Sequence, residues 1–243
     1  MLSLDLDEFM FEFKEGAIKH VGSGLADQIQ NENDTEPFED LDGMIVPGGF
    51  GERGTGGKVF AVHYARTHDI PFLGLCYGFQ MAVIEFARNV VDLEGANSTE
   101  VKSDTPHPVI DLLPDQGEET DAGGTMRLGD HETNITPDTL AHELYDSESV
   151  VERHRHRYEV NPRYVKLLEH NGLNFSGRSG QRMEILEVPD HPFFFATQFH
   201  PEFKSRPTRP SPPFLGLVDA ALDRRRERSG VEVESSENVQ KET

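Results

Sequence analysis

The chain has a single cysteine, Cys76, among its 243 residues, so no disulfide can form within it. This count favours a reducing compartment, and we expect a cytoplasmic protein. The sequence also has no apolar run long enough to span a membrane. Its first residues, 1–7 (MLSLDLD), are acidic and unlike a secretory signal peptide. We therefore expect no membrane partner.

Basic residues are scarce: 23 Lys and Arg stand against 44 Asp and Glu, and the formal net charge is −21. Because binding to phosphates requires positive charge, this balance argues against nucleic acid or an anionic membrane as a partner. The acids are spread along the chain and form no single block. A dispersed acidic surface suits a cytoplasm of very high salt, where salt screens the repulsion between charges. An ordinary acidic enzyme with two disordered ends is the alternative.

Nucleotide-binding loops are also missing. The glycine-rich turn 47–51 (PGGFG) follows a short apolar strand, 44–46, but has neither the Gly-Lys-Ser/Thr of a P-loop nor the G-x-G-x-x-G spacing. A turn of this kind can instead point a backbone N–H into a site where no side chain would fit. Gly49 is our candidate for such a donor. A plain turn is the alternative.

The stretch 70–80 (IPFLGLCYGFQ) carries the strongest signal in the sequence. Residues 70–74 have the pattern of a buried strand, and 77–89 have apolar residues at helical three-four spacing. Cys76 falls between them, flanked by Gly74 and Gly78, as in the G-x-nucleophile-x-G turn. A helix N-terminus lowers a thiol pKa, and the N–H of Tyr77 is placed to donate to an oxyanion. A buried structural cysteine is the alternative.

Strand 44–46, helix 58–68, strand 70–74 and helix 77–89 follow one another with short connections. This order predicts an α/β fold with a doubly wound, mostly parallel sheet. Active sites in such sheets lie at the carboxyl ends of the strands, where Gly49 and Cys76 fall. A further strand, 192–199, ends at His200, with Glu202 two residues on. At the same edge His200 could act as base and Glu202 could orient it; a surface His–Glu pair is the alternative.

The two ends of the chain are less regular. Residues 9–13 alternate and allow a strand, whereas 14–20 resemble the remnant of a helix and 31–37 a loop. Residues 102–122 are rich in proline and acids and are expected to pass over the surface. We expect an irregular, partly degenerate segment at 1–40, an α/β domain at 41–223, and a disordered acidic tail at 224–243.

Residues 152–160 (ERHRHRYEV) contain the densest run of cations. His154 and His156 would lie on the same side of a strand and could bind a metal. Interleaved arginines would repel a dication, so we expect no metal and favour an arginine that binds a carboxylate. A solvated strand edge is the third alternative.

Three stretches, 46–51 (VPGGFG), 74–80 (GLCYGFQ) and 198–203 (QFHPEF), together resemble the class I (triad) glutamine amidotransferases, which have a flavodoxin-like fold. Three more, 95–100 (GANSTE), 123–129 (GGTMRLG) and 153–161 (RHRHRYEVN), resemble the glutaminase domain of CTP synthase. The likeness covers about residues 41–221. In the elbow, Tyr77 and Phe79 replace the usual Leu and Met. The family's first strand is expected to be missing or replaced by residues 2–13, and we find no amidoligase domain.

The resemblance implies hydrolysis of the side-chain amide of L-glutamine by Cys76, His200 and Glu202, with the N–H groups of Gly49 and Tyr77 as the oxyanion hole. It also implies a glutamine-binding set, in which Glu100 pairs with the α-ammonium and Arg157 with the α-carboxylate. The whole set is Gly49, Tyr77, Gly78, Phe79, Gln80, Glu100 and Arg157.

In the family, the ammonia passes to an amidoligase domain that aminates UTP to CTP with ATP and Mg²⁺, and GTP activates the glutaminase. The resemblance thus implies no cofactor for this chain itself. Because the amidoligase half is not found, we expect either a detached subunit with a separate amidoligase chain as its partner or a truncated copy. A free-standing hydrolase of another γ-glutamyl amide and an inactive interaction module are the alternatives.

Overall fold

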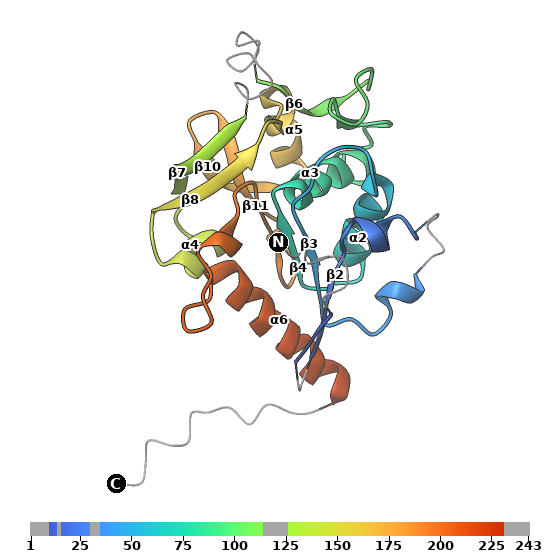
Figure 1. Cartoon of the computed structure of the whole chain (residues 1–243), viewed down its shortest axis with the longest axis vertical. Helices are drawn as coiled ribbons and strands as arrows, with labels where there is room; N and C mark the ends of the chain where they lie inside the picture. The colour runs from blue at the N-terminus through green and yellow to red at the C-terminus, as the bar shows by residue number, and fades with distance from the viewer. Residues whose placement is uncertain (1–9, 14–15, 30–34, 114–125, 231–243) are drawn as a thin grey trace, which may run out of the picture.

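The computed structural model describes residues 10–13, 16–29, 35–113 and 126–230. Within these residues, nine strands form one sheet with helices on both of its faces (Figure 1). The strand order is β1-β2-β3-β4-β12-β11-β10-β7-β8. The strands are β1 (Met10–Phe13), β2 (Gly16–His20), β3 (Gly43–Val46), β4 (Phe72–Leu75), β7 (Arg127–Ile135), β8 (Ser149–His156), β10 (Asn174–Ser179), β11 (Arg182–Glu187) and β12 (Phe194–Thr197).

The strands β2, β3, β4 and β12 run parallel to one another. Every residue of β3, β4 and β12 is buried, which explains why their sequences are continuous apolar runs. Val46 pairs with Gly74, and Thr197 pairs with Leu75, so the three strands end at the same level. This confirms the predicted α/β sheet and places the three candidate site segments on adjacent strands. The remaining neighbours pair antiparallel, which the sequence patterns did not predict.

Two apolar cores cover the two faces of the sheet. Met44 and Val46 belong to the core under α2 and α3, whereas Ile45 belongs to the core under α6. The alternation follows from the period of two in a strand. The helix expected at 77–89 is confirmed in its full length, and the one expected at 58–68 begins earlier. The helices are α1 (Ser23–Ala26), α2 (Thr55–Thr67), α3 (Tyr77–Asn89), α4 (Leu140–Tyr145), α5 (Pro162–His170) and α6 (Pro212–Ser229).

The helix remnant expected over residues 14–20 is wrong for residues 16–20, the part that the structure describes. Residues Gly16–His20 form β2, and Ile18, Lys19 and His20 pair in parallel with β3. The open edge of β3 offers backbone hydrogen bonds to this segment, and such pairing overrides a local helical pattern. β2 therefore occupies the sheet position next to β3, with β1 at the outer edge of the sheet. The strand allowed at 9–13 is present as β1, and residues 1–9 and 30–34 lie outside the described part of the chain.

Two boundaries also differ from the expectation. The helix α6 continues past residue 223 to Ser229, and Arg224 and Arg228 donate hydrogen bonds to Asp69 O and to the buried Asp42. The segment 102–122 is not wholly a surface excursion, because β6 (Pro108–Asp111) buries its two central residues. β6 forms a small second sheet with β5 (Asn97–Ser98) and β9 (Glu159–Val160). Residues 114–125 and 231–243 lie outside the described part.

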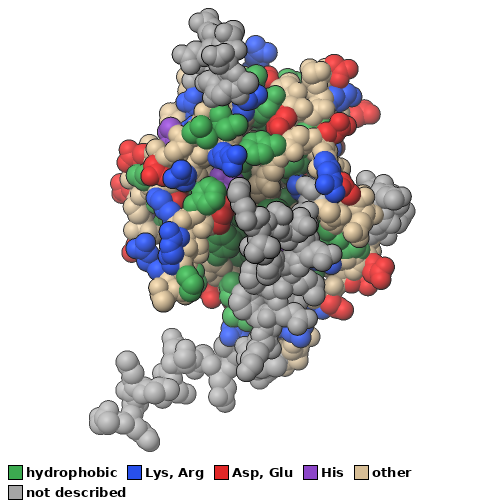
Figure 2. All heavy atoms as spheres, in the orientation of Figure 1, with side chains coloured by type: hydrophobic (Ala, Val, Ile, Leu, Met, Phe, Trp, Pro, Cys, Tyr) green, Lys and Arg blue, Asp and Glu red, His purple; other side chains and the backbone are tan. Residues whose placement is uncertain are grey.

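On the face drawn in Figure 2, acidic side chains are scattered among basic and uncharged ones and do not form a single patch. None of the helices in the described residues has the combination of length and apolar composition needed to cross a membrane.

Candidate active site

Cys76 lies at a strained bend between β4 and α3. Its backbone has φ 49° and ψ −93°, a conformation that side chains other than glycine seldom adopt. Its N–H donates to Thr197 O at 2.7 Å, which ties the bend to the end of β12. The cost of this conformation is offset by the surrounding buried elements. The backbone therefore presents the sulfur at the carboxyl edge of the sheet, as the sequence predicted.

Gly74 and Gly78, which flank Cys76, are required for close packing; the positive φ angle belongs to Cys76. A Cβ atom on Gly78 would lie 2.0 Å from Val46 O, and one on Gly74 would lie 2.9 Å from the backbone of Gly78. Any side chain at Gly78 would push α3 away from β3. The glycines thus let the first turn of α3 sit directly on the sheet, with Cys76 carrying the strain.

His200 and Glu202 stand at the same edge. β12 pairs in parallel with β4, and His200 and Glu202 follow β12, with Glu202 on the short 3₁₀ helix η4 (Pro201–Phe203). His200 Nδ1 lies 2.6 Å from Glu202 Oε1. Because a carboxylate only accepts, Nδ1 carries the proton and Nε2 is left as the basic nitrogen. Nε2 is buried and has no hydrogen-bond partner among the described residues.

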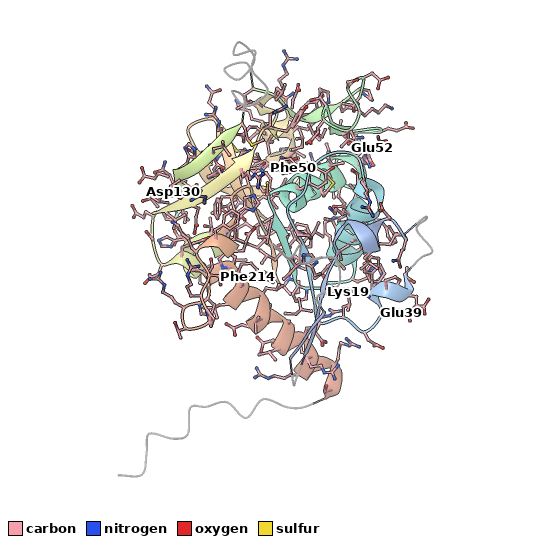
Figure 3. The ribbon with its side chains drawn as sticks, viewed as in Figure 1. Lys19, Glu39, Phe50, Glu52, Asp130 and Phe214 are labelled. Atoms are coloured by element: carbon pink, nitrogen blue, oxygen red, sulfur yellow. The ribbon has the colours of Figure 1, made fainter. Side chains whose placement is uncertain are left out.

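The glycine-rich turn brings the imidazole and the cysteine together. A Cβ atom on Gly48 would lie 3.0 Å from His200 Cε1 and 3.7 Å from Cys76 Cβ. Both side chains therefore border the same small space, and a side chain at Gly48 would fill it. A Cβ on Gly49 would lie 3.7 Å from Tyr77 Cδ1, so the two candidate oxyanion donors are neighbours. Figure 3 labels Phe50 and Glu52, on either side of Gly51, above β3 and β4 in that view.

Tyr77 holds this turn in place with its side chain. Its hydroxyl donates to Gly51 O and shares a 2.8 Å hydrogen bond with Thr55 Oγ1. The ammonium of Lys58 lies 5.1 Å from the ring centroid, within the range of a cation–π contact. The sequence assigned only the N–H of Tyr77 to the site. The phenol in addition positions the turn that carries Gly49.

Glu100 and Arg157, the expected partners of the substrate's charged groups, lie in one neighbourhood. Glu100 Oε1 accepts from the N–H of Gly51 at 2.9 Å. Burial first, and then the charge of Glu100, raise the pKa of the Tyr158 phenol, while the charge of Arg157 lowers it. Both charged groups therefore act on the same ring, and Glu100 also contacts the turn that carries Gly49.

Gln80, Gly78 and Phe79 come from the first turns of α3. Gln80 is buried; its Nε2 donates to Tyr158 O at 3.1 Å, and its Oε1 has no hydrogen-bond partner among the described residues. Phe79 is fully buried in the core under α3, and Gly78 packs against β3. Of the three, Gln80 alone contributes a polar side chain at the site, and the expected binding roles of Gly78 and Phe79 rest on the resemblance.

Comparison with known proteins settles the family. The family model described as "Glutamine amidotransferase class-I" matches residues 21–220. The chain belongs to this family. It is 58% identical over 234 residues to a CTP synthase of Archaeoglobus fulgidus, which covers 92% of this chain and 44% of that protein. It is 67% identical over 182 residues to a CTP synthase of Natronomonas pharaonis, which covers 75% of this chain and 33% of that protein.

A solved structure agrees with these relatives. The glutaminase domain of Trypanosoma brucei CTPS, described with bound acivicin, superposes with a TM-score of 0.76 at 38% identity and covers 82% of this chain and 78% of that one. The amidotransferase chain spans less than half the length of the two CTP synthases above. The match therefore corresponds to the glutaminase part of those proteins.

The electrostatics of this amidotransferase site correct one expectation. Burial raises the pKa of the Cys76 thiol, and the charges of Glu202 and Glu159 raise it further. The N–H of Tyr77 at the start of α3 and the side-chain amide of Gln198 act in the opposite direction but do not outweigh burial. The sequence argument predicted a lowered pKa from the helix N-terminus alone, because it could not weigh burial. The resting group is a neutral thiol that needs a base.

Behind the site lies a buried cluster that includes His154 and His156. Within the described residues, ligand atoms of His154, His156 and Glu184 all lie within 4.8 Å of one another, a spacing that a metal could use. His154 Nδ1 and His156 Nε2 share a hydrogen bond of 2.9 Å, and Arg127 donates to Glu184. Burial, followed by the charge of Arg127, lowers the pKa of both histidines. Arg127 is the cation that pairs with the Glu184 carboxylate. The two neutral imidazoles form a hydrogen bond with each other on β8.

Two residues at the site escaped the sequence analysis. Gly48 was treated only as part of a turn, although its missing side chain makes room for His200. Gln198 was noted only within a motif, yet its side chain reaches Cys76. A signal for Gln198 existed: in the run 193–199 (FFFATQF), Thr197 and Gln198 are polar and the other five residues are apolar. A buried polar side chain in such a run needs a hydrogen-bond partner and thereby marks a structured polar site.

Proposed function

We propose that this chain is the glutaminase part of a CTP synthase-like enzyme and hydrolyses the side-chain amide of L-glutamine to glutamate and ammonia. The observation that carries the proposal is the strained Cys76 at the sheet edge, beside the hydrogen-bonded pair of His200 and Glu202. The high identity to CTP synthases supports it.

The proposed chemistry begins from a neutral thiol. His200 Nε2 takes the proton of Cys76 Sγ as the sulfur attacks the amide carbon of glutamine. The N–H groups of Gly49 and Tyr77 donate to the oxygen that becomes negative. The proton on His200 then passes to the amide nitrogen, ammonia leaves, and a γ-glutamyl thioester remains on Cys76. A water molecule then gives a proton to His200 Nε2 while its oxygen attacks the thioester carbon. The C–S bond breaks, glutamate is released, and His200 passes the proton to Sγ to restore the thiol. Glu202 keeps the proton on Nδ1 throughout.

The proposed binding set recognises the two charges of the amino acid. The carboxylate of Glu100, already held at Gly51, is assigned to the α-ammonium, and Arg157 to the α-carboxylate. Gln80 Oε1, a buried acceptor without a hydrogen-bond partner among the described residues, is available to a donor of the substrate. The backbones of Gly78 and Phe79 complete the pocket floor in this assignment. A charged partner for each of the two groups on the α-carbon favours a free amino acid over an amide within a protein.

The ammonia would be used by an amidoligase. The two relatives named above are CTP synthases, and the chain spans less than half the length of each. We infer that an amidoligase in the cytoplasm, proposed here to be a separate chain, accepts the ammonia and aminates UTP to CTP. ATP, Mg²⁺ and GTP are needed by that complete enzyme, and none is assigned to residues of this chain.

The test is the release of glutamate from L-glutamine in molar KCl, with and without an amidoligase chain. Cys76→Ala and His200→Gln should abolish release. His63 provides a matched control for His200→Gln, because it too is paired with a carboxylate. His63 Nδ1, on α2, lies 2.9 Å from the Glu85 carboxylate, on α3, away from Cys76. His63→Gln should leave the activity unchanged. Acivicin, described with the Trypanosoma brucei domain, should inactivate the wild type.

Other results would contradict the proposal. Glutamate release that survives Cys76→Ala would assign the activity to another group. Turnover of other γ-glutamyl amides but not of glutamine would indicate a free-standing hydrolase. A folded chain with no activity that still binds the amidoligase would indicate an interaction module.

A further inference from the structure

Gln198 is a polar residue placed inside the protein at the end of β12. It is completely buried, and its backbone N–H donates to Glu184 O at 2.8 Å, so its position is fixed by the sheet. Its side-chain Nε2 lies 3.5 Å from Cys76 O and 3.8 Å from Cys76 Sγ. The side chain therefore touches the atom that attacks the substrate in the proposed function.

The orientation of this amide is determined by two backbone carbonyls. Tyr158 O can only accept, so the NH₂ group of Gln80 faces it at 3.1 Å. The same NH₂ group lies 3.3 Å from Gln198 Oε1, which accepts its second proton. The NH₂ group of Gln198 must then face Cys76, whose carbonyl also only accepts. The chain of hydrogen bonds fixes a donor, and not an acceptor, against the sulfur.

We propose that Gln198 is a catalytic residue that donates an N–H to the Cys76 sulfur and stabilises the negative charge that develops on it during attack. The inference rests on the proposed function in that Cys76 is taken as the nucleophile.

The charged groups around the sulfur make this donor significant. Glu202 on η4 and Glu159 on β9 both oppose a negative charge on Cys76, and His200 lies on the other side of Gly48. Burial opposes the charge more strongly than either. The N–H of Tyr77 is also claimed by the oxyanion in the proposed chemistry. Within the described part of the chain, Gln198 then remains as the side-chain donor to the sulfur. Its hydrogen bond with Gln80 joins it to the proposed substrate pocket.

The test measures the alkylation rate of the thiol itself, in the full chain in molar KCl, from neutral to alkaline pH. Cys76 is the only cysteine, so incorporation of iodoacetamide reports one group. Gln198→Met keeps the length and removes the donor. Gln198→Glu keeps the shape and the acceptor for Gln80 but places a carboxylate oxygen against the sulfur. Thr197→Val, a neighbouring buried change that removes a 2.9 Å hydrogen bond to Phe199 O, is the control.

The donor role predicts an order of rates that packing does not. Gln198→Met should displace the pH profile by about one pH unit to higher pH, about a tenfold fall in rate at a given pH. Gln198→Glu should be slower still, because its charge repels the thiolate, and Thr197→Val should follow the wild type. If packing alone mattered, the nearly isosteric Gln198→Glu would lie closest to the wild type.

Wild-type profiles for both Gln198 variants, or a faster Gln198→Glu than Gln198→Met, would overturn the inference. If one Gln198 variant does not fold, the other still tests the inference, because the alkylation rate of each variant is predicted to fall below that of the wild type. If neither folds, alkylation of the wild type decides: it should shift the side-chain amide resonances of Gln198, and unchanged resonances would refute the contact. Alkylation requires no turnover. A chain that does not hydrolyse glutamine but shows the predicted order of alkylation rates would refute the proposed function and support the inference. A chain that hydrolyses glutamine but does not show this order would support the proposed function and refute the inference.

Discussion

The substitution Glu202→Gln should change two properties of the site in opposite directions. Glu202 Oε1 lies 2.6 Å from His200 Nδ1, and its charge is, after burial, the largest factor that raises the pKa of the Cys76 thiol. Removing the charge should therefore slow glutamine hydrolysis, because the imidazole loses its orientation. The same change should make the thiol more reactive toward iodoacetamide, because a thiolate is easier to form.

The size of the loss can be estimated from the hydrogen bond. A hydrogen bond to a charged group contributes about 1.5–3 kcal/mol. The Glu202 side chain is 36% exposed, so solvent screening favours the lower end of this range. At about 1.4 kcal/mol for each factor of ten, kcat should fall roughly tenfold. The loss of kcat would approach about 10⁴-fold only if the side-chain amide introduced by Glu202→Gln moved the His200 proton from Nδ1 to Nε2, the wrong tautomer.

The assay compares glutamate release and iodoacetamide alkylation in the same preparation. Glu143→Gln, an equal change of charge at an exposed position of α4, is the control and should alter neither rate. A fall in both rates for Glu202→Gln would indicate a general disturbance of the site. No change in either would refute the assignment of Glu202 to the triad.

Three further predictions concern the elbow and the surface. Tyr77→Phe should lower kcat/KM for glutamine about tenfold and leave alkylation unchanged, because it frees the turn at Gly51; equal kinetics would show that the phenol is dispensable. Gly78→Ala should lower the free energy of unfolding by about 3 kcal/mol, measured by thermal unfolding, because the new methyl group meets Val46 O. The control Gly56→Ala places its methyl group in open space and should raise the free energy of unfolding by up to about 1 kcal/mol. Equal effects of the two substitutions would contradict the packing of Gly78 against β3. With a net charge of −21, the melting temperature should rise from low to molar KCl, and a falling one would contradict the high-salt interpretation.

The parts of the fold that sequence patterns predicted are those where local and tertiary preferences agree. The helix over Tyr77–Asn89 and the strand before Cys76 have the correct period and strong turn signals, and both are present. Gly16–His20 has no such agreement, and pairing with β3 decides its conformation. The antiparallel half of the sheet depends on pairings between segments far apart in sequence, such as β7 with β10, which no local pattern encodes.

The candidate site divides along the same line. Cys76, His200 and Glu202 could be selected because each stands at a strand end, a position that the chain order reveals. Gln198 could not be selected in the same way, because its role depends on which buried carbonyls fix its amide. The thiol pKa was predicted in the wrong direction for a related reason, since burial is a property of the whole fold.

The most direct test of the central claim is covalent capture of Cys76 by a glutamine-like electrophile, followed by mass spectrometry of the intact chain and of its peptides in molar salt. A single adduct on the peptide that contains Cys76, formed more slowly when L-glutamine is present and absent in Cys76→Ala, is the predicted result. Folded protein that forms no adduct, or an adduct that L-glutamine does not slow, would contradict the account.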